Sequence, residues 1–315
     1  MKVDLHYHGM IGFMDFWRDK QGYAGKNILR QIIESASEKD IGMFALISEF
    51  DEIPKGSFHD RFNYLLKNYS QGMDRNKFDY EKLGDKDIAA VLIDKEKGKK
   101  IIMLNGQTVI VEEDGRRYDH LVIGTNQVPN HLGLEDTLKI AQDMGAVQIA
   151  EHPFGINGIG EENLGKYREF FDAIEGHNAQ FCFDGILSKI PPFSQYSRKI
   201  NEKAQNFAFY HLMPWIATSD GHRIEDIGTA FIELFLNYYK PENEERIIDS
   251  LKENLRKKLF LSYKGYPNQL DNLKTKFQII TGVNSIKHYE ELSRRNGQIP
   301  LQDNETWRKN YPKFQ

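Results

Sequence analysis

Two histidines near the start of the chain are spaced as metal ligands often are. His6 and His8 follow the apolar segment 3–5, which has the composition of a short strand. Alternate residues of a strand point to the same side, so we expect both imidazoles on one face. Two imidazoles on one face supply half of a site for a divalent metal ion. Asp15, in the loop that follows, is either a further oxygen ligand or a solvated loop residue.

Two other strand ends have residues of the same chemical kind. His152 follows the apolar segment 146–150 and is itself followed by a proline, which ends a strand. Asp220 and His222 follow the apolar segment 215–217 and again alternate. Active sites of α/β barrels form at the carboxyl ends of strands, so these segments predict one shared metal site. The alternative is that Asp220 caps a turn and His222 binds a backbone carbonyl, and the agreement of three strand ends favours the metal site.

The composition restricts which ligands such a metal can have. The chain has 315 residues, with ten histidines and a single cysteine. One cysteine excludes an intramolecular disulfide and any zinc site with several cysteine ligands, so the ligands must be His, Asp and Glu. Cys182 lies between two phenylalanines and is expected to be a buried thiol. His177 follows another predicted strand and either faces the site or lies in an exposed loop. We expect surface or packing roles for His59, His131, His211 and His288.

Short apolar strands alternate with amphipathic helices along most of the chain, which is typical of a parallel sheet covered by helices. A helix is predicted over residues 27–36, where apolar side chains recur at helical spacing, and a strand over residues 43–47 follows it. Hydrophobic residues make up 40% of the chain, which is enough for a large core and excludes a disordered chain. Further strands are expected over residues 120–123, 146–150, 173–175 and 215–217, and helices over 134–144, 161–171 and 198–209.

The ordered set of these motifs resembles the PHP family, which is named for bacterial DNA polymerases and histidinol phosphatases. The residues that show it are Asp4-Leu5-His6-Tyr7-His8, Glu151-His152-Pro153-Phe154, Asp172-Ala173-Ile174-Glu175 with Asn178, and Ser219-Asp220-Gly221-His222. The resemblance covers residues 1–260 and implies an α/β fold, a distorted (β/α)7 TIM-like barrel. It also implies phosphoester hydrolysis with about one to three divalent metal ions, and it makes His120 a further histidine ligand. The expected metal ligands are therefore His6, His8, Asp15, His120, His152, Asp220 and His222.

Two positions depart from the pattern of that family. Where the family usually has a histidine after the second strand, this chain has Phe50, and we align Thr108 with the metal-bridging glutamate. A bridging carboxylate offsets part of the repulsion between two cations, and neither replacement side chain is charged. The residues that would compensate are Glu49, Asp51, Glu112 or Glu113. A barrel with weakened catalysis that binds a metal or another ligand is therefore one alternative.

Two segments interrupt the alternation of strands and helices. Residues 54–100 are polar and mixed in charge, and residues 100–111, with Asn105-Gly106 at their centre, predict a β-hairpin. We interpret residues 54–118 as an insertion over one end of the barrel. Residues 261–315 have weaker helical patterns and no chemical motif, which predicts a helical C-terminal extension that packs on the barrel or on a second subunit.

The sequence favours a metal-dependent hydrolase of the PHP type that cleaves a phosphate ester. The expected metals are Mn²⁺, Zn²⁺ or Fe²⁺, because most of the ligands are imidazoles. A small phosphorylated molecule is the expected substrate, and Arg223 either binds its phosphate or forms a surface ion pair. Amidohydrolase-type barrels also begin with His-x-His and end with a ligand aspartate, so hydrolysis of a C–N or C–O bond is the alternative reaction.

Charge and hydropathy restrict the partners and the location. The chain has 42 Lys and Arg against 46 Asp and Glu, a formal charge of −4, so it has no general basic field that attracts nucleic acid. No run of about 18 apolar residues occurs, so no membrane-spanning helix is predicted. No signal peptide is visible either, because the first residues lack an apolar stretch after a basic segment. We therefore expect a cytoplasmic protein without a membrane partner, and a nucleic-acid partner is not favoured.

Overall fold

The computed structural model describes residues 1–9, 28–51, 57–59, 61–68, 73–185, 187–189, 193–235, 244–268 and 301–302. Its strands are β1 (Lys2–Tyr7), β2 (Ile41–Asp51), β3 (Ser57–His59), β4 (Phe78–Leu83), β5 (Ala89–Asp94), β6 (Lys99–Glu113), β7 (Arg116–Ile123), β8 (Val147–Ala150), β9 (Ala173–Asn178), β10 (Trp215–Thr218), β11 (Phe231–Leu234), β12 (Phe260–Tyr263) and β13 (Leu301–Gln302). Its α-helices are α2 (Ile28–Glu38), α3 (Arg61–Asn68), α4 (Leu134–Asp143), α5 (Gly160–Lys166), α6 (Arg198–Tyr210) and α7 (Glu244–Arg256). Short 3-10 helices are η1 (Arg168–Phe170), η2 (Leu187–Lys189), η3 (Phe193–Tyr196) and η4 (Ile224–Asp226).

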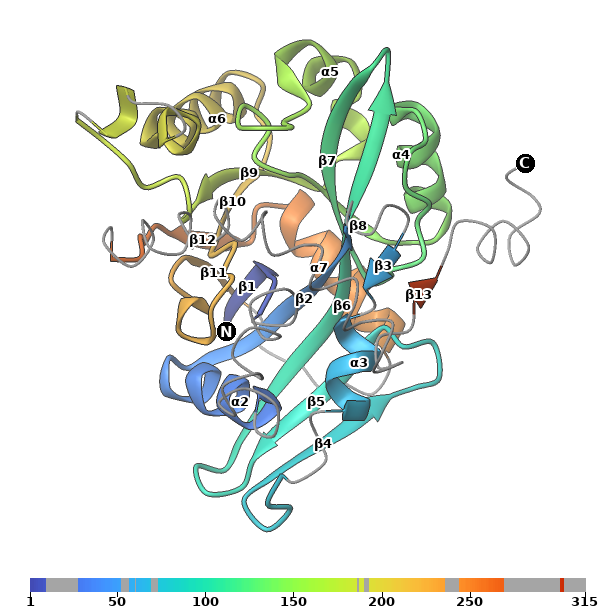
Figure 1. Cartoon of the computed structure of the whole chain (residues 1–315), viewed down its shortest axis with the longest axis vertical. Coiled ribbons are helices and arrows are strands. Elements are labelled where there is room, and N and C mark those ends of the chain that lie inside the picture. Colours follow the sequence, from blue (N-terminus) through green and yellow to red (C-terminus); the bar gives the residue numbers. More distant parts are fainter. Residues whose placement is uncertain are drawn as a thin grey trace, which may run out of the picture.

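The strands form one strongly curved sheet of mixed direction (Figure 1). Nine of the described strands follow one another along its main path, in the order β10-β9-β8-β7-β6-β2-β1-β11-β12. β1, β2 and β6 are parallel, as are β8, β9 and β10, whereas β7, β11 and β12 pair antiparallel with their neighbours. The predicted α/β class with a barrel-shaped sheet is confirmed, although the antiparallel β7 makes the sheet mixed.

The curved sheet nearly closes on itself where β1 approaches the segment after β10. Gly221 forms a parallel bridge with Tyr7, and its carbonyl accepts a hydrogen bond of 2.9 Å from the His8 amide. The buried carboxylate of Asp4 accepts a hydrogen bond of 3.1 Å from the amide of Ser219, which is 215 positions later in the chain. We call this junction between β1 and the segment after β10 the barrel seam. It nearly closes the sheet into a barrel and places the first strand beside residues 219–222.

An apolar core fills the barrel. It contains buried side chains from β1, β2, β5–β11 and helix α7, among them Leu5, Ile47, Leu104 and Ile149. Helices α2, α4 and α6 pack on the outer side of the sheet, in separate apolar clusters. Figure 1 shows α7 behind the central strands and the other helices around them. Because alternate residues of a strand point to opposite faces, polar residues that continue the inward alternation line the end of the barrel.

The hairpin predicted at Asn105-Gly106 is wrong. Both residues lie inside the long strand β6, which pairs with β2. Gly106 allows close packing rather than a turn, because an added Cβ would lie 2.6 Å from Ile47 Cδ1. The hairpin turn is at Asp114 and Gly115, which have φ of 51° and 72°, as a tight two-residue turn requires. Strands β6 and β7 are therefore barrel strands, although they fall within residues 54–118.

The segment after α7 begins with a strand. β12 pairs antiparallel with β11 and extends the sheet, so residues 260–263 are not helical. Farther along, Gly265 and Tyr266 contact His177, which is buried in β9 rather than exposed in a loop. Most of residues 269–315 lie outside the described residues, so the helical extension and the domain division at residue 260 stay predictions. Within the described part of the chain, no helix has the length and apolar character needed to cross a bilayer.

Candidate metal centre

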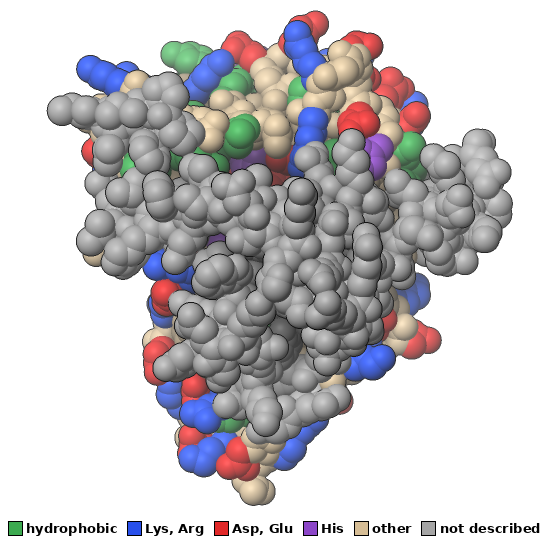
Figure 2. Space-filling view, in the orientation of Figure 1, with side chains coloured by type: hydrophobic (Ala, Val, Ile, Leu, Met, Phe, Trp, Pro, Cys, Tyr) green, Lys and Arg blue, Asp and Glu red, His purple; other side chains and the backbone are tan. Residues whose placement is uncertain are grey.

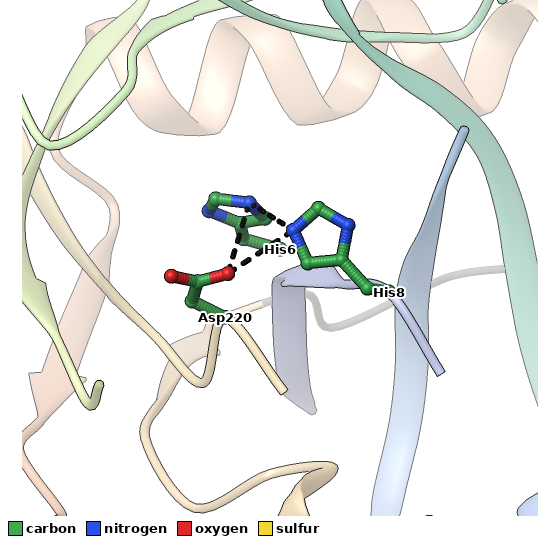
Figure 3. Close-up of side chains that lie close together, drawn as sticks. All are labelled: His6, His8 and Asp220. Carbon is green, nitrogen blue, oxygen red and sulfur yellow. Dashed lines mark hydrogen bonds and ion pairs between the residues drawn. The ribbon is translucent and has the colours of Figure 1, made fainter. Parts of the chain in front are cut away.

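Three side chains meet at the barrel seam with their ligand atoms close together. His6 Nε2 lies 2.9 Å from His8 Nε2 and 3.5 Å from Asp220 Oδ1, and His8 Nε2 lies 3.1 Å from the same oxygen. One ligand atom from each residue lies within 4.8 Å of the others, and all three residues are buried. Figure 3 shows both rings and the carboxylate pointing toward one another. The structure thus brings the first predicted strand end together with the last.

A sharp turn after β10 aims the Asp220 carboxylate at β1. Asp220 has a φ of 45°, in the left-handed region that aspartate tolerates better than most residues. Gly221 allows close contact with β1, because an added Cβ would lie 2.9 Å from a ring carbon of Tyr7 and 2.7 Å from Asp226 Cβ. Left-handed residues cost free energy and persist where the surrounding structure holds them, which is common at functional sites. The turn therefore serves to place the carboxylate.

A second layer of polar side chains orients these ligands. Glu175, fully buried on β9, accepts a hydrogen bond of 2.8 Å from His6 Nδ1 and another from the hydroxyl of Thr218. Asn178 donates from its amide nitrogen to Glu175 Oε2 and to Asp220 Oδ2, at 3.0 Å each. A carboxylate on Nδ1 leaves Nε2 to face a cation and is the usual support of metal-binding histidines.

The electrostatics of the site favour a cation. Burial alone would lower the pKa of His6, but the carboxylates of Asp220, Glu175 and Glu151 raise it well above its usual value. Burial opposes ionisation of Glu175, yet His6 and His152 lower the pKa of Glu175 to about 2. The metal-free protein therefore holds a protonated imidazole among several carboxylates. A divalent cation supplies the same compensation when the imidazole is neutral and acts as a ligand.

His8 is held from two sides. Arg61 Nη1 lies 2.9 Å from His8 Nδ1 and donates 3.0 Å to the carbonyl of Ile47. A guanidinium only donates, so His8 Nδ1 accepts in this arrangement. Coordination of a cation through His8 Nε2 would move the ring proton to Nδ1 and turn the Arg61 guanidinium away from it. The His222 ring stacks on His8 with centroids 4.5 Å apart, and His222 Nε2 lies 3.4 Å from Asp220 Oδ1. His222 therefore joins the cluster at its edge, where its side chain is 29% exposed.

Glu151 and His152 continue the site beyond β8. Glu151 Oε1 lies 3.4 Å from His6 Nε2 and 3.3 Å from His152 Nε2. The amide of His152 donates 2.8 Å to Glu175 Oε2, which fixes the loop to the second layer. Burial alone would lower the pKa of His152, but Glu151 raises it to about 9. His152 and His6 therefore both contact the Glu151 carboxylate but do not contact each other directly.

Two neighbouring residues of β7 face opposite sides of the sheet. Asp119 alternates with the core residue Leu121 and points inward, where burial and Glu151 raise its pKa to about 6. His120 points outward: its Nε2 lies 3.1 Å from the side-chain oxygen of Gln148, and its ring packs edge-on against Phe171. Burial lowers the pKa of His120 to about 4, so the ring is neutral. The structure does not bring His120 to the cluster.

The remaining predicted site residues lie elsewhere. Arg223 Nη2 donates 2.6 Å to Asp226 Oδ1, and its Nε lies 3.2 Å from both oxygens of that carboxylate. This is the ion-pair alternative of the sequence analysis, not a contact with the cluster. Thr108 is buried on the inward face of β6, and among the described residues its hydroxyl has no hydrogen-bond partner. Asp15 and the side chain of Phe50 lie outside the described residues.

Comparison with solved structures finds three similar chains, at low sequence identity. The structure is similar to that of a two-domain protein from Bacteroides vulgatus that contains a predicted PHP-like metal-dependent phosphoesterase. The two share 14% sequence identity over 88% of this chain and 69% of the other, with a TM-score of 0.48. PsfC from Pseudomonas syringae gives 12% identity, 89% and 96% coverage and a TM-score of 0.48. A proposed metal-dependent phosphoesterase from Bifidobacterium adolescentis gives 12% identity, 71% and 88% coverage and a TM-score of 0.39.

No protein-family model and no curated protein sequence matches the chain. His6, His8 and Asp220 offer two nitrogen ligands and one oxygen ligand, which suits Zn²⁺, Mn²⁺ or Fe²⁺. The ligands are buried and already oriented by Glu175 and Asn178. The residues present thus fit a divalent cation.

Three contributors to the site were not expected as site residues. Arg61 falls in a segment without a motif, so its contact with His8 left no signal in the sequence. Glu151 and Asp119 did leave one, because they alternate with the apolar core residues Ile149 and Leu121. An acidic residue at an inward position of a barrel strand indicates a role in the site.

Proposed function

We propose that this protein is a metal-dependent hydrolase of the PHP type that cleaves a phosphate ester. The observation that supports the proposal is the buried convergence of His6, His8 and Asp220 at the barrel seam. Its place at the carboxyl ends of β1 and β10 is where α/β barrels build active sites. Glu175 and Asn178 keep the ligand atoms in position, so a cation binds without rearranging the loops.

His6 Nε2, His8 Nε2 and Asp220 Oδ1 are the atoms that would hold the cation. When bound, a divalent cation supplies Lewis acidity, which stabilises negative charge on phosphoryl oxygens and makes a nearby water more acidic. Glu175 keeps the proton of His6 on Nδ1, so Nε2 stays a ligand. Arg61 and the stacked His222 restrict the rotation of the His8 ring.

His222 is suited to move a proton. Its ring is partly exposed at the edge of the cluster, and its Nε2 lies 3.4 Å from Asp220 Oδ1. In hydrolysis a bond forms between a water oxygen and phosphorus, and the bond between phosphorus and the alcohol oxygen breaks. We assign His222 Nε2 as the donor of the proton that the departing alcohol oxygen takes up.

The expected substrate is a small phosphorylated molecule. Figure 2 shows Lys and Arg side chains interspersed with Asp and Glu on the described part of this face, without a continuous basic band. Binding along a nucleic-acid backbone relies on several Lys or Arg side chains that contact phosphates together. The mixed charges therefore support a small substrate, and the cytoplasmic location remains part of the same proposal.

A phosphatase assay tests the proposal. In Mn²⁺ buffer the protein should hydrolyse p-nitrophenyl phosphate, and Asp220→Asn should lower kcat/KM by about 100-fold or more. Asp143→Asn, on the exposed end of α4, is the matched control and should leave the rate unchanged. Equal rates for wild type and Asp220→Asn would overturn the proposal. Hydrolysis of a lactone or cyclic amide but not of phosphates would replace it with the amidohydrolase-type reaction. If the protein binds a metal ion but hydrolyses none of these substrates, it is a metal-binding protein without this catalytic activity.

A further inference from the structure

One buried carboxylate joins the histidine cluster to the loop after β8. Glu151 is 3% exposed, and its Oε1 lies 3.4 Å from His6 Nε2 and 3.3 Å from His152 Nε2. These two nitrogens belong to different strand ends, and a single carboxylate oxygen reaches both. A buried carboxylate has about four acceptor sites, so contact with two rings leaves capacity for cations.

The same region has buried polar atoms that nothing in the described residues satisfies. Glu151 Oε2 and His152 Nδ1 are buried and have no hydrogen-bond partner there. An unsatisfied buried polar atom destabilises the folded protein, and more so when the group is charged. Such atoms are rare in folded proteins, and an ion is one accepted explanation for them. Both belong to residues that offer metal-ligand atoms.

Asp119 adds a second carboxylate to this region. It points inward from β7 and is 8% exposed, and Leu121, two residues after it, pairs with Ile149, two residues before Glu151. The side-chain nitrogen of Asn157 donates 3.0 Å to Asp119 Oδ2, and Arg117 Nε lies 3.4 Å from Oδ1. Two carboxylates and one imidazole beside the first cluster form an oxygen-rich surrounding of the kind that Mn²⁺ prefers.

We propose that Glu151 is a carboxylate shared by two cation positions, one at His6, His8 and Asp220 and the other at His152 and Asp119. This inference rests on the proposed function, because the first position is the same. Two cations held close together would repel each other strongly, and a shared carboxylate would offset part of that repulsion. Thr108, the residue aligned with the bridging position, has an uncharged hydroxyl and supplies no such charge. Glu151 supplies it from another strand.

The simpler alternative is that Glu151 only neutralises a protonated His152. In that case one cation binds at the histidine cluster, and removal of the Glu151 charge leaves that cation in place. The number of bound cations therefore distinguishes the two arrangements. Glu151→Gln keeps the size and polarity of the side chain and removes its charge, so it is the variant to use.

The experiment measures Mn²⁺ binding by equilibrium dialysis and by electron paramagnetic resonance. Wild type should bind two Mn²⁺ per chain with a spin-coupled spectrum, and Glu151→Gln should bind one with an uncoupled spectrum. Glu162→Gln, on the exposed face of α5, is the matched control and should behave as wild type. Asp119→Asn should also lose the second Mn²⁺. If circular dichroism shows that Glu151→Gln is unfolded, Asp119→Asn is measured in its place.

Two results would overturn the inference. Wild type that binds a single Mn²⁺ would refute the second position, and two coupled Mn²⁺ in both variants would refute the roles of Glu151 and Asp119. Either result leaves the proposed function standing if the same protein hydrolyses p-nitrophenyl phosphate. Conversely, two coupled Mn²⁺ without hydrolysis would refute the proposed function and support the shared carboxylate.

Discussion

His6 and Glu175 form a fully buried pair, with 2.8 Å between Nδ1 and Oε1. Both residues come from strand ends, His6 from β1 and Glu175 from β9, and neither side chain is accessible to solvent. The carboxylate raises the pKa of the imidazole and fixes which nitrogen faces the centre of the site. The orientation of the His6 ring therefore depends on Glu175, which would not itself need to contact a bound cation.

Replacing Glu175 with glutamine should weaken cation binding. Loss of the carboxylate leaves the His6 ring without its charged acceptor, and disruption of such support typically costs about 10–100-fold in metal affinity. The dissociation constant for Mn²⁺ checks this. Glu169→Gln, at an exposed glutamate of η1, should leave the constant unchanged. An unaltered Mn²⁺ affinity in Glu175→Gln would show that His6 is not a ligand.

Cation binding should become tighter as pH rises. Burial opposes protonation of His6, but its carboxylate neighbours raise its pKa well above the usual value, so the metal-free ring is protonated near neutral pH. A cation must displace that proton, so affinity should rise about tenfold per pH unit for each proton released, until the pKa of metal-free His6 is passed. Equilibrium dialysis at pH 6, 7 and 8 tests this. A dissociation constant that does not change over this range would exclude a protonated His6.

His120 should affect stability in acid and not cation binding. Burial lowers its pKa from 6.5 to about 4 in the folded protein, so between these values the unfolded chain binds more protons. Its contribution is thus intact above pH 6.5, and about 3 kcal/mol of stability is lost as pH falls to 4. His120→Gln should make urea unfolding less sensitive to pH in this window and keep the Mn²⁺ content of wild type. A lower Mn²⁺ content in His120→Gln than in wild type would show that His120 is a metal ligand after all.

Removal of the guanidinium of Arg223 should change hydrolysis little. Its nitrogens are occupied by Asp226, within the same short turn. Arg223→Gln should therefore keep kcat/KM for p-nitrophenyl phosphate within about threefold of wild type, since a lost phosphate contact typically costs about 100-fold. Thermal unfolding in parallel reports any loss from the broken ion pair. A large rise in KM without a change in stability would identify Arg223 as a phosphate ligand.

Chelation should destabilise the protein. A cation held by His6, His8 and Asp220 binds only the folded chain, so at 100 times its dissociation constant it adds about 2.7 kcal/mol of stability. The urea midpoint should fall by the corresponding amount in excess EDTA and return on addition of Mn²⁺. Asp220→Asn should have the same midpoint with and without EDTA. A midpoint of wild type that does not respond to EDTA would show that the site is empty in solution.

The strand-end histidines could be predicted from the sequence because each one follows a short apolar strand directly. The structure brings together His6, His8, Asp220 and His222, as expected. His152 does not contact them directly, because the carboxylate of Glu151 lies between His152 and His6. His120 does not follow this rule, because the apolar residues 121–123 come after it, and only the resemblance to the PHP family indicated it as a ligand. Its strand, β7, runs antiparallel to both of its neighbours. Alternation along β7 then turns the ring outward, toward Gln148. Strand direction depends on long-range pairing, which local sequence patterns do not contain.

The hairpin shows the same limit. Asn-Gly is a strong turn signal, yet in β6 the glycine is required by the contact of its backbone with Ile47. The true turn, Asp114-Gly115, has an equally good signal, and only the pairing of β6 with β2 decides between them. Likewise, Arg61 at the start of α3 contacts His8, just after β1, and the spacing of these residues in the sequence does not predict this contact.

The barrel seam has a consequence for the order of events during synthesis. His6 and His8 leave the ribosome well before Asp220, which belongs to a turn much later in the chain. Until then the nascent chain has the two imidazoles without the Asp220 carboxylate, which is a weak and unselective cation site. We therefore expect any cation that binds here to be selected after β10 is in place, by the folded barrel and not by the growing chain.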